Sequence, residues 1–201
     1  MGIDITLYEL GPSRSARARW ALLEAGLDFK SIEDRKLLGS DELKKVHPLG
    51  KFPAILIDGK PLFESAAICT KIADLVPEKD LIAKPGTWDR ALHDQWVCFA
   101  LTEMEAYTWS NALNTFVLPE EKRVPAMLQQ NADGYTRGAA ALNAALGDSD
   151  YLIGNLFSVT DIIVGYTVNW GRRQGYLDNF SNLQRYVERL FTRPHCALNP
   201  D

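Results

Sequence analysis

The sequence has few of the residues from which disulfide frameworks and metal sites are built. Only three of its 201 residues are cysteine and three are histidine. The cysteines, Cys69, Cys98 and Cys196, lie far apart and share no C-x-x-C spacing, which argues against a disulfide framework, a zinc site and a dithiol redox motif. We therefore expect no bound metal, and we expect Cys69 and Cys98 to be core residues on helices.

The sequence also lacks an excess of positive charge and any long apolar run. Its formal net charge is -4 at pH 7, and its cationic residues are scattered among acidic ones, so we expect no nucleic-acid partner. No segment approaches the roughly 20 apolar residues that cross a bilayer. The N-terminus shows no basic segment followed by an apolar stretch. We therefore expect a cytoplasmic protein that does not associate with membranes.

Strand and helix signals alternate in the first part of the chain. They predict a strand at 3–8, a helix that ends at Gly26, a strand at 27–32, a short helix or turn at 41–46, strands at 54–57 and 60–63, and a helix from Glu64-Ser65 to just before Pro77. A right-handed crossover makes the first two strands parallel. Asp58-Gly59 predicts a hairpin between the last two strands. The predicted order is βαβ, a short helix, then ββα.

No strand signal follows the first part of the chain. Helical patterns cover about 87–116, 121–146, 158–170 and 182–191. Ser158 and Asp161 have the spacing of a capping box, which predicts the start of a buried helix. We therefore expect an α/β domain at 1–77 and an all-helical domain at 87–201, joined by a charged linker at 78–86.

The end of the first strand carries a hydroxyl at a place suited to an anion. Gly11-Pro12 ends the strand and Ser13 follows at the predicted start of the first helix. The first N–H groups of a helix have no partner inside it and carry partial positive charge, so an anion is stabilised there. Ser13 either donates its hydroxyl to such an anion or caps its own helix by accepting from backbone N–H groups.

Four motifs occur in order along the chain, each beside an element boundary. They are Ser13-Arg-Ser-Ala-Arg17-Ala18, His47-Pro-Leu-Gly-Lys-Phe-Pro53, Glu64-Ser65 and Ser158-Val-Thr-Asp161. With this pattern of elements, the chain resembles the cytosolic glutathione transferases over its whole length. Its first motif is similar to that of the serine-type members, the theta-like and bacterial ones. The resemblance implies a thioredoxin-like N-terminal domain (βαβ-α-ββα), an all-α C-terminal domain, glutathione as co-substrate and a homodimer.

The resemblance implies that Ser13 acts on the glutathione sulfur. Its hydroxyl would hydrogen-bond the sulfur and favour the thiolate, and Arg17, one turn along, would add positive potential. Ser13 would not be a nucleophile, because no histidine is placed beside it. Ser15 is the alternative donor, since the active residue of related bacterial sequences can lie a step or two later.

The resemblance also implies how the rest of the tripeptide is bound. Pro53 would be cis, which turns the Phe52 N–H and C=O toward the cysteinyl part of glutathione. Glu64 and Ser65 would bind the γ-glutamyl ammonium and carboxylate at a helix N-terminus, or Ser65 would be only an N-cap. Lys51 would contact the glycyl carboxylate.

The implied function is conjugation of the glutathione thiolate to small hydrophobic electrophiles, as in detoxification. Glutathione-dependent disulfide reduction and non-catalytic ligand or partner binding on the same fold are alternatives. Theta-like members often place a His and then a Lys where this chain has Leu38 and Gly39. The matching contact to the glycyl carboxylate is therefore missing, which leaves Lys51 or Lys36 to replace it.

Overall fold

A four-stranded mixed sheet in the order β2-β1-β3-β4 organises the first part of the chain. The computed structural model describes residues 2–198. The strands are β1 (Ile5–Tyr8), β2 (Lys30–Ile32), β3 (Ala54–Ile57) and β4 (Lys60–Phe63). β1 pairs in parallel with β2, and the β1–β3 and β3–β4 pairs are antiparallel. The expected parallel pair and the Asp58-Gly59 hairpin are therefore confirmed.

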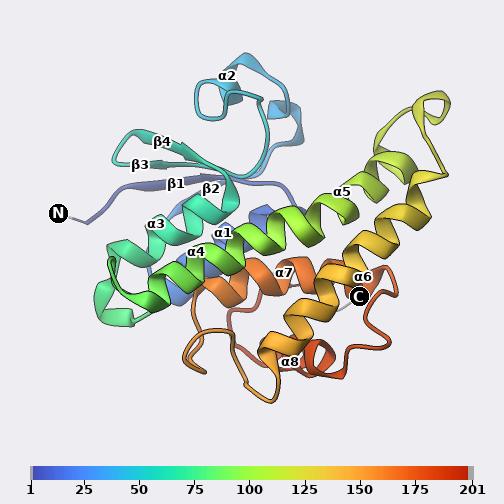
Figure 1. Ribbon diagram of the computed structural model, residues 1–201. Coiled ribbons are helices and arrows are strands. Elements are labelled where there is room, and N and C mark those ends of the chain that lie inside the picture. Colours follow the sequence, from blue (N-terminus) through green and yellow to red (C-terminus); the bar gives the residue numbers. More distant parts are fainter. Residues whose placement is uncertain (1, 199–201) are drawn as a thin grey trace. The chain divides into compact units, whose positions relative to one another are not determined.

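Helices cover both faces of this sheet. They are α1 (Ser15–Ala25), α2 (Asp41–Lys44) and α3 (Ser65–Leu75). α1 and α3 pack side by side on one face (Figure 1), and Trp20, Leu22 and Ile68 are fully buried there. On the other face, Leu43 of α2 packs against Ala54. The order of elements is the expected thioredoxin-like one.

The first helix begins two residues later than expected. Ser13 was predicted to open it, but α1 begins at Ser15. The Ala16 N–H donates to the Ser13 C=O and the Arg17 N–H to the Arg14 C=O, so a tighter turn precedes the first α-helical bond. The predicted end is confirmed, because Gly26 follows with a φ of 66°, a conformation that glycine adopts at little cost.

Among the described residues after Ile82, regular secondary structure is helical apart from one isolated bridge at Ile153–Leu156. The α-helices of this part are α4 (Trp88–Ala100), α5 (Ala106–Ala112), α6 (Met127–Leu146), α7 (Val159–Arg173) and α8 (Ser181–Phe191). The chain divides into two compact units between Ile82 and Ala83, with Pro194–Leu198 belonging to the first. The domain bounds 1–77 and 87–201 stay a prediction. Within residues 2–198, no helix combines the length and apolar character that a membrane crossing requires.

Two of the expected long helices differ in the structure. The helix expected at 87–116 is interrupted by π-helical segments at Leu101–Glu105 and Leu113–Val117. The helix expected at 121–146 begins only at Met127. Pro125 explains the late start, since a proline disfavours the helical conformation in the residue before it.

One cysteine was placed wrongly from the sequence. Cys69 is buried, as expected, but Cys98 is exposed on α4. The core face of α4 carries His93, Val97 and Ala100, which recur at helical spacing. Cys98 lies about 100° around the helix from Val97, and so it faces outward.

The expected capping box at the start of α7 is confirmed. The Ser158 N–H donates to Asp161 Oδ2 at 2.9 Å, and Ser158 Oγ accepts from the Thr160 N–H at 3.2 Å. The other carboxylate oxygen of Asp161 accepts from the Leu152 N–H at 3.1 Å and from the Tyr186 hydroxyl at 2.9 Å. Asp161 therefore joins α7 to the preceding loop and to α8.

Asp161→Asn is expected to destabilise the helical unit by about 2 kcal/mol. The new amide NH₂ cannot accept a hydrogen bond, so the N–H of Leu152 or of Ser158 loses its acceptor. Burial raises the pKa of Asp161 to about 6, against its hydrogen bonds. The folded protein therefore binds this proton before the unfolded chain does, and its stability falls as pH rises from about 4 to about 6. Urea unfolding should show a larger gap between wild type and variant at about pH 4.5 than at pH 7, since Asn does not titrate. The exposed Asp133→Asn is the control; a gap that widens with rising pH would contradict this account.

Candidate functional site

Strand register places three of the four motifs at one edge of the sheet. Tyr8, the last residue of β1, pairs with Ala54, the first of β3, and Ala54 pairs with Phe63, the last of β4. The segment that carries Ser13 follows Tyr8, and the Lys51-Phe52-Pro53 turn precedes Ala54. Glu64-Ser65 follows Phe63. The segments that carry the candidate residues therefore meet at one edge of the sheet within the first unit; the residues are Ser13, Lys51, Phe52, Pro53, Glu64 and Ser65.

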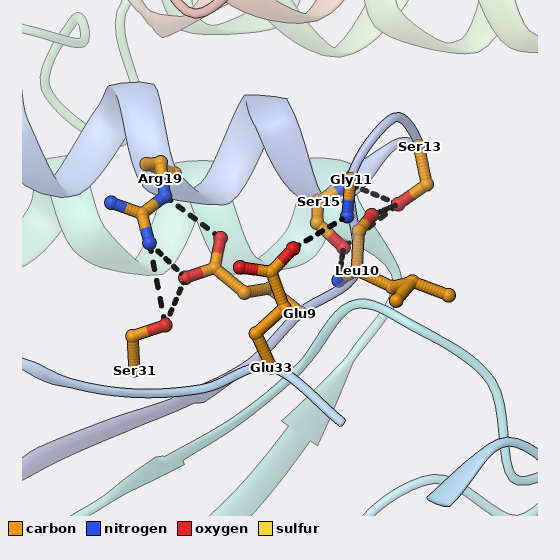
Figure 2. Close-up of polar contacts among 8 residues, drawn as sticks. All are labelled: Glu9, Leu10, Gly11, Ser13, Ser15, Arg19, Ser31 and Glu33. Atoms are coloured by element: carbon orange, nitrogen blue, oxygen red, sulfur yellow. Dashed lines mark hydrogen bonds and ion pairs between the residues drawn. The ribbon is translucent and has the colours of Figure 1, made fainter. Parts of the chain in front are cut away.

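Ser13 lies in a short network of hydrogen bonds between β1 and α1 (Figure 2). Its Oγ lies 2.5 Å from the Leu10 carbonyl oxygen and 2.9 Å from Ser15 Oγ. It also accepts from the Ser15 backbone N–H at 3.1 Å, which is how a capping serine acts. Ser13 is half-buried, whereas Ser15 is 2% exposed. The N-cap residue of α1 is Arg14, so the interpretation of Ser13 as the N-cap is wrong, and the Ser13 hydroxyl occupies a partly open position before the helix.

Next to this network lies an ion pair between Glu9 and Arg19 that was not predicted. The buried carboxylate of Glu9 accepts from Arg19 through both of its oxygens, and Ser31 donates to it at 2.5 Å. The hydrogen bond from Arg19 to Glu9 raises the pKa of Arg19. Glu9 continues the inward alternation of Ile5 and Leu7. A charged residue at an inward strand position was the signal that could have revealed this pair.

The Phe52–Pro53 peptide bond is cis, as expected, and so is Gly11–Pro12, which was not predicted. The Phe52 side chain packs against the cluster around Leu43. The backbone N–H and C=O of Phe52 form no hydrogen bond with any group among residues 2–198. Lys51 is exposed. The turn therefore offers one backbone donor, one acceptor and one mobile cation.

His47, which opens the second motif, shapes this turn as an acceptor. Its Nδ1 accepts from the Leu49 N–H at 3.1 Å, and its ring contacts that of Phe63. Burial lowers its pKa, which favours the neutral ring that this hydrogen bond requires.

Glu64 is the N-cap residue of α3, so the alternative in which Ser65 is the N-cap is wrong. Glu64 has a φ of 69°, a conformation that costs a non-glycine residue of order 1 kcal/mol and often occurs at functional sites. Ser65 Oγ accepts from Nη1 of Arg17 at 3.3 Å, and Arg17 is only 1% exposed. A buried cation on α1 is therefore aimed at the first residue of α3.

Leu38 and Gly39, where the sequence departs from the theta-like pattern, lie directly against the cis-proline turn. The Gly39 N–H donates to the Gly50 carbonyl oxygen at 2.8 Å. Leu38 is 53% exposed, and Lys36 is exposed in the preceding turn. Gly39 thus contributes its backbone at the place where a lysine side chain was expected from the resemblance.

Gly50→Ala is expected to destabilise the first unit and to weaken ligand binding by the turn. Gly50 has a φ of 59°, and an added Cβ would lie 2.8 Å from the Gly39 Cα. Gly59→Ala is a matched control, since Gly59 has a φ of 73° and nothing within 4 Å of an added Cβ. Urea unfolding should show a loss at least about 1 kcal/mol larger for Gly50→Ala. Equal losses would show that the Gly39 contact is unimportant.

Among residues 2–198, no group of three or more His, Cys, Asp or Glu side chains is placed to hold a metal ion.

Two family models match two successive parts of the chain. Residues 3–74 match the glutathione S-transferase N-terminal domain, and residues 89–194 match the C-terminal domain.

Two curated relatives differ in how much of their length is matched. The glutathione S-transferase GstA of Escherichia coli O157:H7 is 27% identical over 182 residues, which is 86% of each chain. Elongation factor 1-gamma of Prunus avium is 29% identical over 155 residues, which is 75% of this chain but only 35% of that relative. A solved sphingomonad glutathione S-transferase complexed with glutathione is 25% identical, with a TM-score of 0.81 over 95% of this chain and 94% of that one. The chain belongs to the glutathione S-transferase family.

Proposed function

We propose that the protein is a glutathione transferase that binds glutathione at the edge defined by Tyr8, Ala54 and Phe63 and activates its thiol with Ser13. The observation that carries the proposal is that register brings the three motifs to this one edge. Family membership supports glutathione as the co-substrate, as does the sphingomonad relative, which was solved with glutathione bound.

Ser13 stabilises the thiolate by donating its hydroxyl to the sulfur. Lowering a thiol pKa of about 9 by two units requires roughly 2.7 kcal/mol of preferential thiolate binding. A hydrogen bond to a charged group supplies about 1.5–3 kcal/mol, and a helix N-terminus adds about 0.3–1 kcal/mol. The thiol proton leaves to solvent, and the sulfur lone pair then attacks the electrophile and displaces its leaving group. Ser13 forms no covalent bond.

The other motifs hold the peptide part of glutathione. The Phe52 N–H and C=O pair with the cysteinyl backbone, as in an antiparallel ladder. Ser65 accepts from Arg17, so its own hydroxyl proton points elsewhere, and we assign it to the γ-glutamyl carboxylate. The exposed Glu64 carboxylate accepts from the γ-glutamyl ammonium.

The glycyl carboxylate is assigned to Lys51. Gly39 has no side chain to offer, and its N–H is used by Gly50. Lys51 is the cation nearest in sequence to Phe52, and Lys36 is the alternative. A single flexible lysine gives a weaker contact than a fixed pair of donors, because it loses more side-chain entropy on binding.

A small hydrophobic electrophile, a homodimer and a cytoplasmic location complete the proposal. They rest on the family, not on a contact in this structure. Light scattering tests the dimer, which should have twice the mass of the 22.5 kDa chain.

Ser13→Ala is expected to raise the pKa of bound glutathione by about two units and to lower the conjugation rate at neutral pH by up to about a hundredfold. The ultraviolet absorption of the thiolate, followed across pH, measures the pKa directly. Ser149→Ala, an exposed serine in the helical unit, should behave as wild type.

An unchanged pH–rate profile in Ser13→Ala would exclude the role of Ser13. Failure of the wild type to bind glutathione at millimolar concentration would instead favour the non-catalytic alternative. Faster turnover of a small disulfide than of an aryl halide would favour disulfide reduction.

A further inference from the structure

Leu10, Ser13 and Ser15 close a ring of hydrogen bonds (Figure 2). The Leu10 N–H donates to Ser15 Oγ at 3.2 Å, and Ser15 Oγ lies 2.9 Å from Ser13 Oγ. Ser13 Oγ in turn lies 2.5 Å from the Leu10 carbonyl oxygen. The ring therefore begins and ends on the backbone of the same residue.

A count of protons sets the direction of the ring. The Leu10 carbonyl has no proton, so the short contact to it must use the one hydroxyl proton of Ser13. The contact between the two hydroxyls must then use the proton of Ser15. Ser13 Oγ also receives the Ser15 backbone N–H at 3.1 Å. Ser13 thus accepts two hydrogen bonds from Ser15 and donates one to Leu10.

We infer that Ser15 is a positioning residue for Ser13: its hydroxyl holds and polarises the Ser13 oxygen, so that an arriving sulfur has only the Leu10 carbonyl to displace. This inference rests on the proposed function. Rotation of one hydroxyl exchanges Leu10 for the sulfur, and both hydrogen bonds from Ser15 remain. Donors to a hydroxyl oxygen strengthen the bond that the hydroxyl itself donates, by roughly 10–30% per bond.

The two serines differ in burial, and this difference gives them different roles. Ser13 is half-buried, but Ser15 is 2% exposed and its oxygen is engaged by Leu10 and Ser13. A sulfur atom therefore meets Ser13 first. The alternative in which Ser15 is the direct donor would break the hydrogen bond from Ser15 to Ser13 and would require the sulfur to reach a side chain that is almost fully buried.

Charged groups around the ring act independently of Ser15. Glu9 is neutralised by Arg19, and the buried Arg17 points to Ser65. The exposed Glu33 accepts from the Gly11 N–H at 3.2 Å, so its negative charge opposes a thiolate at this site. Glu33→Gln removes this charge and keeps an acceptor for Gly11, which makes it a control that acts through the electrostatic field alone.

A double-mutant cycle on the full chain tests the inference. The thiolate pKa of bound glutathione is measured in wild type, Ser13→Ala, Ser15→Ala and the double variant. Ser15→Ala alone should raise the pKa by about half a unit, and it should add nothing once Ser13 is absent. Glu33→Gln should lower the pKa by the same amount in the wild type and in Ser13→Ala. Binding of S-methylglutathione, which has no thiol, should be unchanged in Ser15→Ala.

Ser15→Thr, which keeps the hydroxyl, should retain the wild-type pKa. The inference is overturned if Ser15→Ala leaves the pKa unchanged, or if its effect persists in the Ser13→Ala background. It is also overturned if Ser15→Ala raises the pKa while Ser13→Ala does not, which would make Ser15 the direct donor. A cycle in which Ser13→Ala raises the pKa but Ser15→Ala does not would reject this inference and leave the proposed function intact.

Discussion

The pairing of β1, β3 and β4 is the constraint on which the candidate site depends. Because Tyr8, Ala54 and Phe63 are in register, the segments that leave these strands emerge at one edge of the sheet. A slip of one residue would move the inward side chains, such as Leu7 and Ile55, to the opposite face. The hydrophobic core therefore fixes the relative positions of three segments that are each too short to fix them alone.

An ion pair and a close backbone contact add to the strand register in holding the segments of the site. Glu9 and Arg19 join the end of β1 to α1, and the Gly39–Gly50 contact joins the segment before α2 to the cis-proline turn. Each of these contacts lies beside a proposed glutathione contact, not within it. A few polar atoms therefore provide the proposed chemistry of the site, and contacts between neighbouring elements hold the segments that carry these atoms.

Periodicity predicted the elements of the first unit well, because one face of each strand and helix is buried and glycine or proline stands at most boundaries. Periodicity predicted less well the helix boundaries and buried faces that depend on tertiary packing or on local hydrogen bonds. Ser13 accepts from the Ser15 N–H within a tight turn, so α1 begins only at Ser15, and no residue pattern distinguishes that turn from a helix start. Cys98 faces outward because tertiary contacts choose which stripe of α4 is buried. Glu9 was recognisable only as a charge at an inward position, and its partner lies ten residues away on α1.

The most direct test of the central claim is an ultraviolet titration of glutathione bound to the wild-type protein, compared with free glutathione under the same conditions. If the edge formed by the three motifs activates the thiol, the bound thiolate should appear about two pH units below the free one. Binding with an unshifted thiol pKa would contradict the account, because it would mean that the protein holds the tripeptide without stabilising its anion.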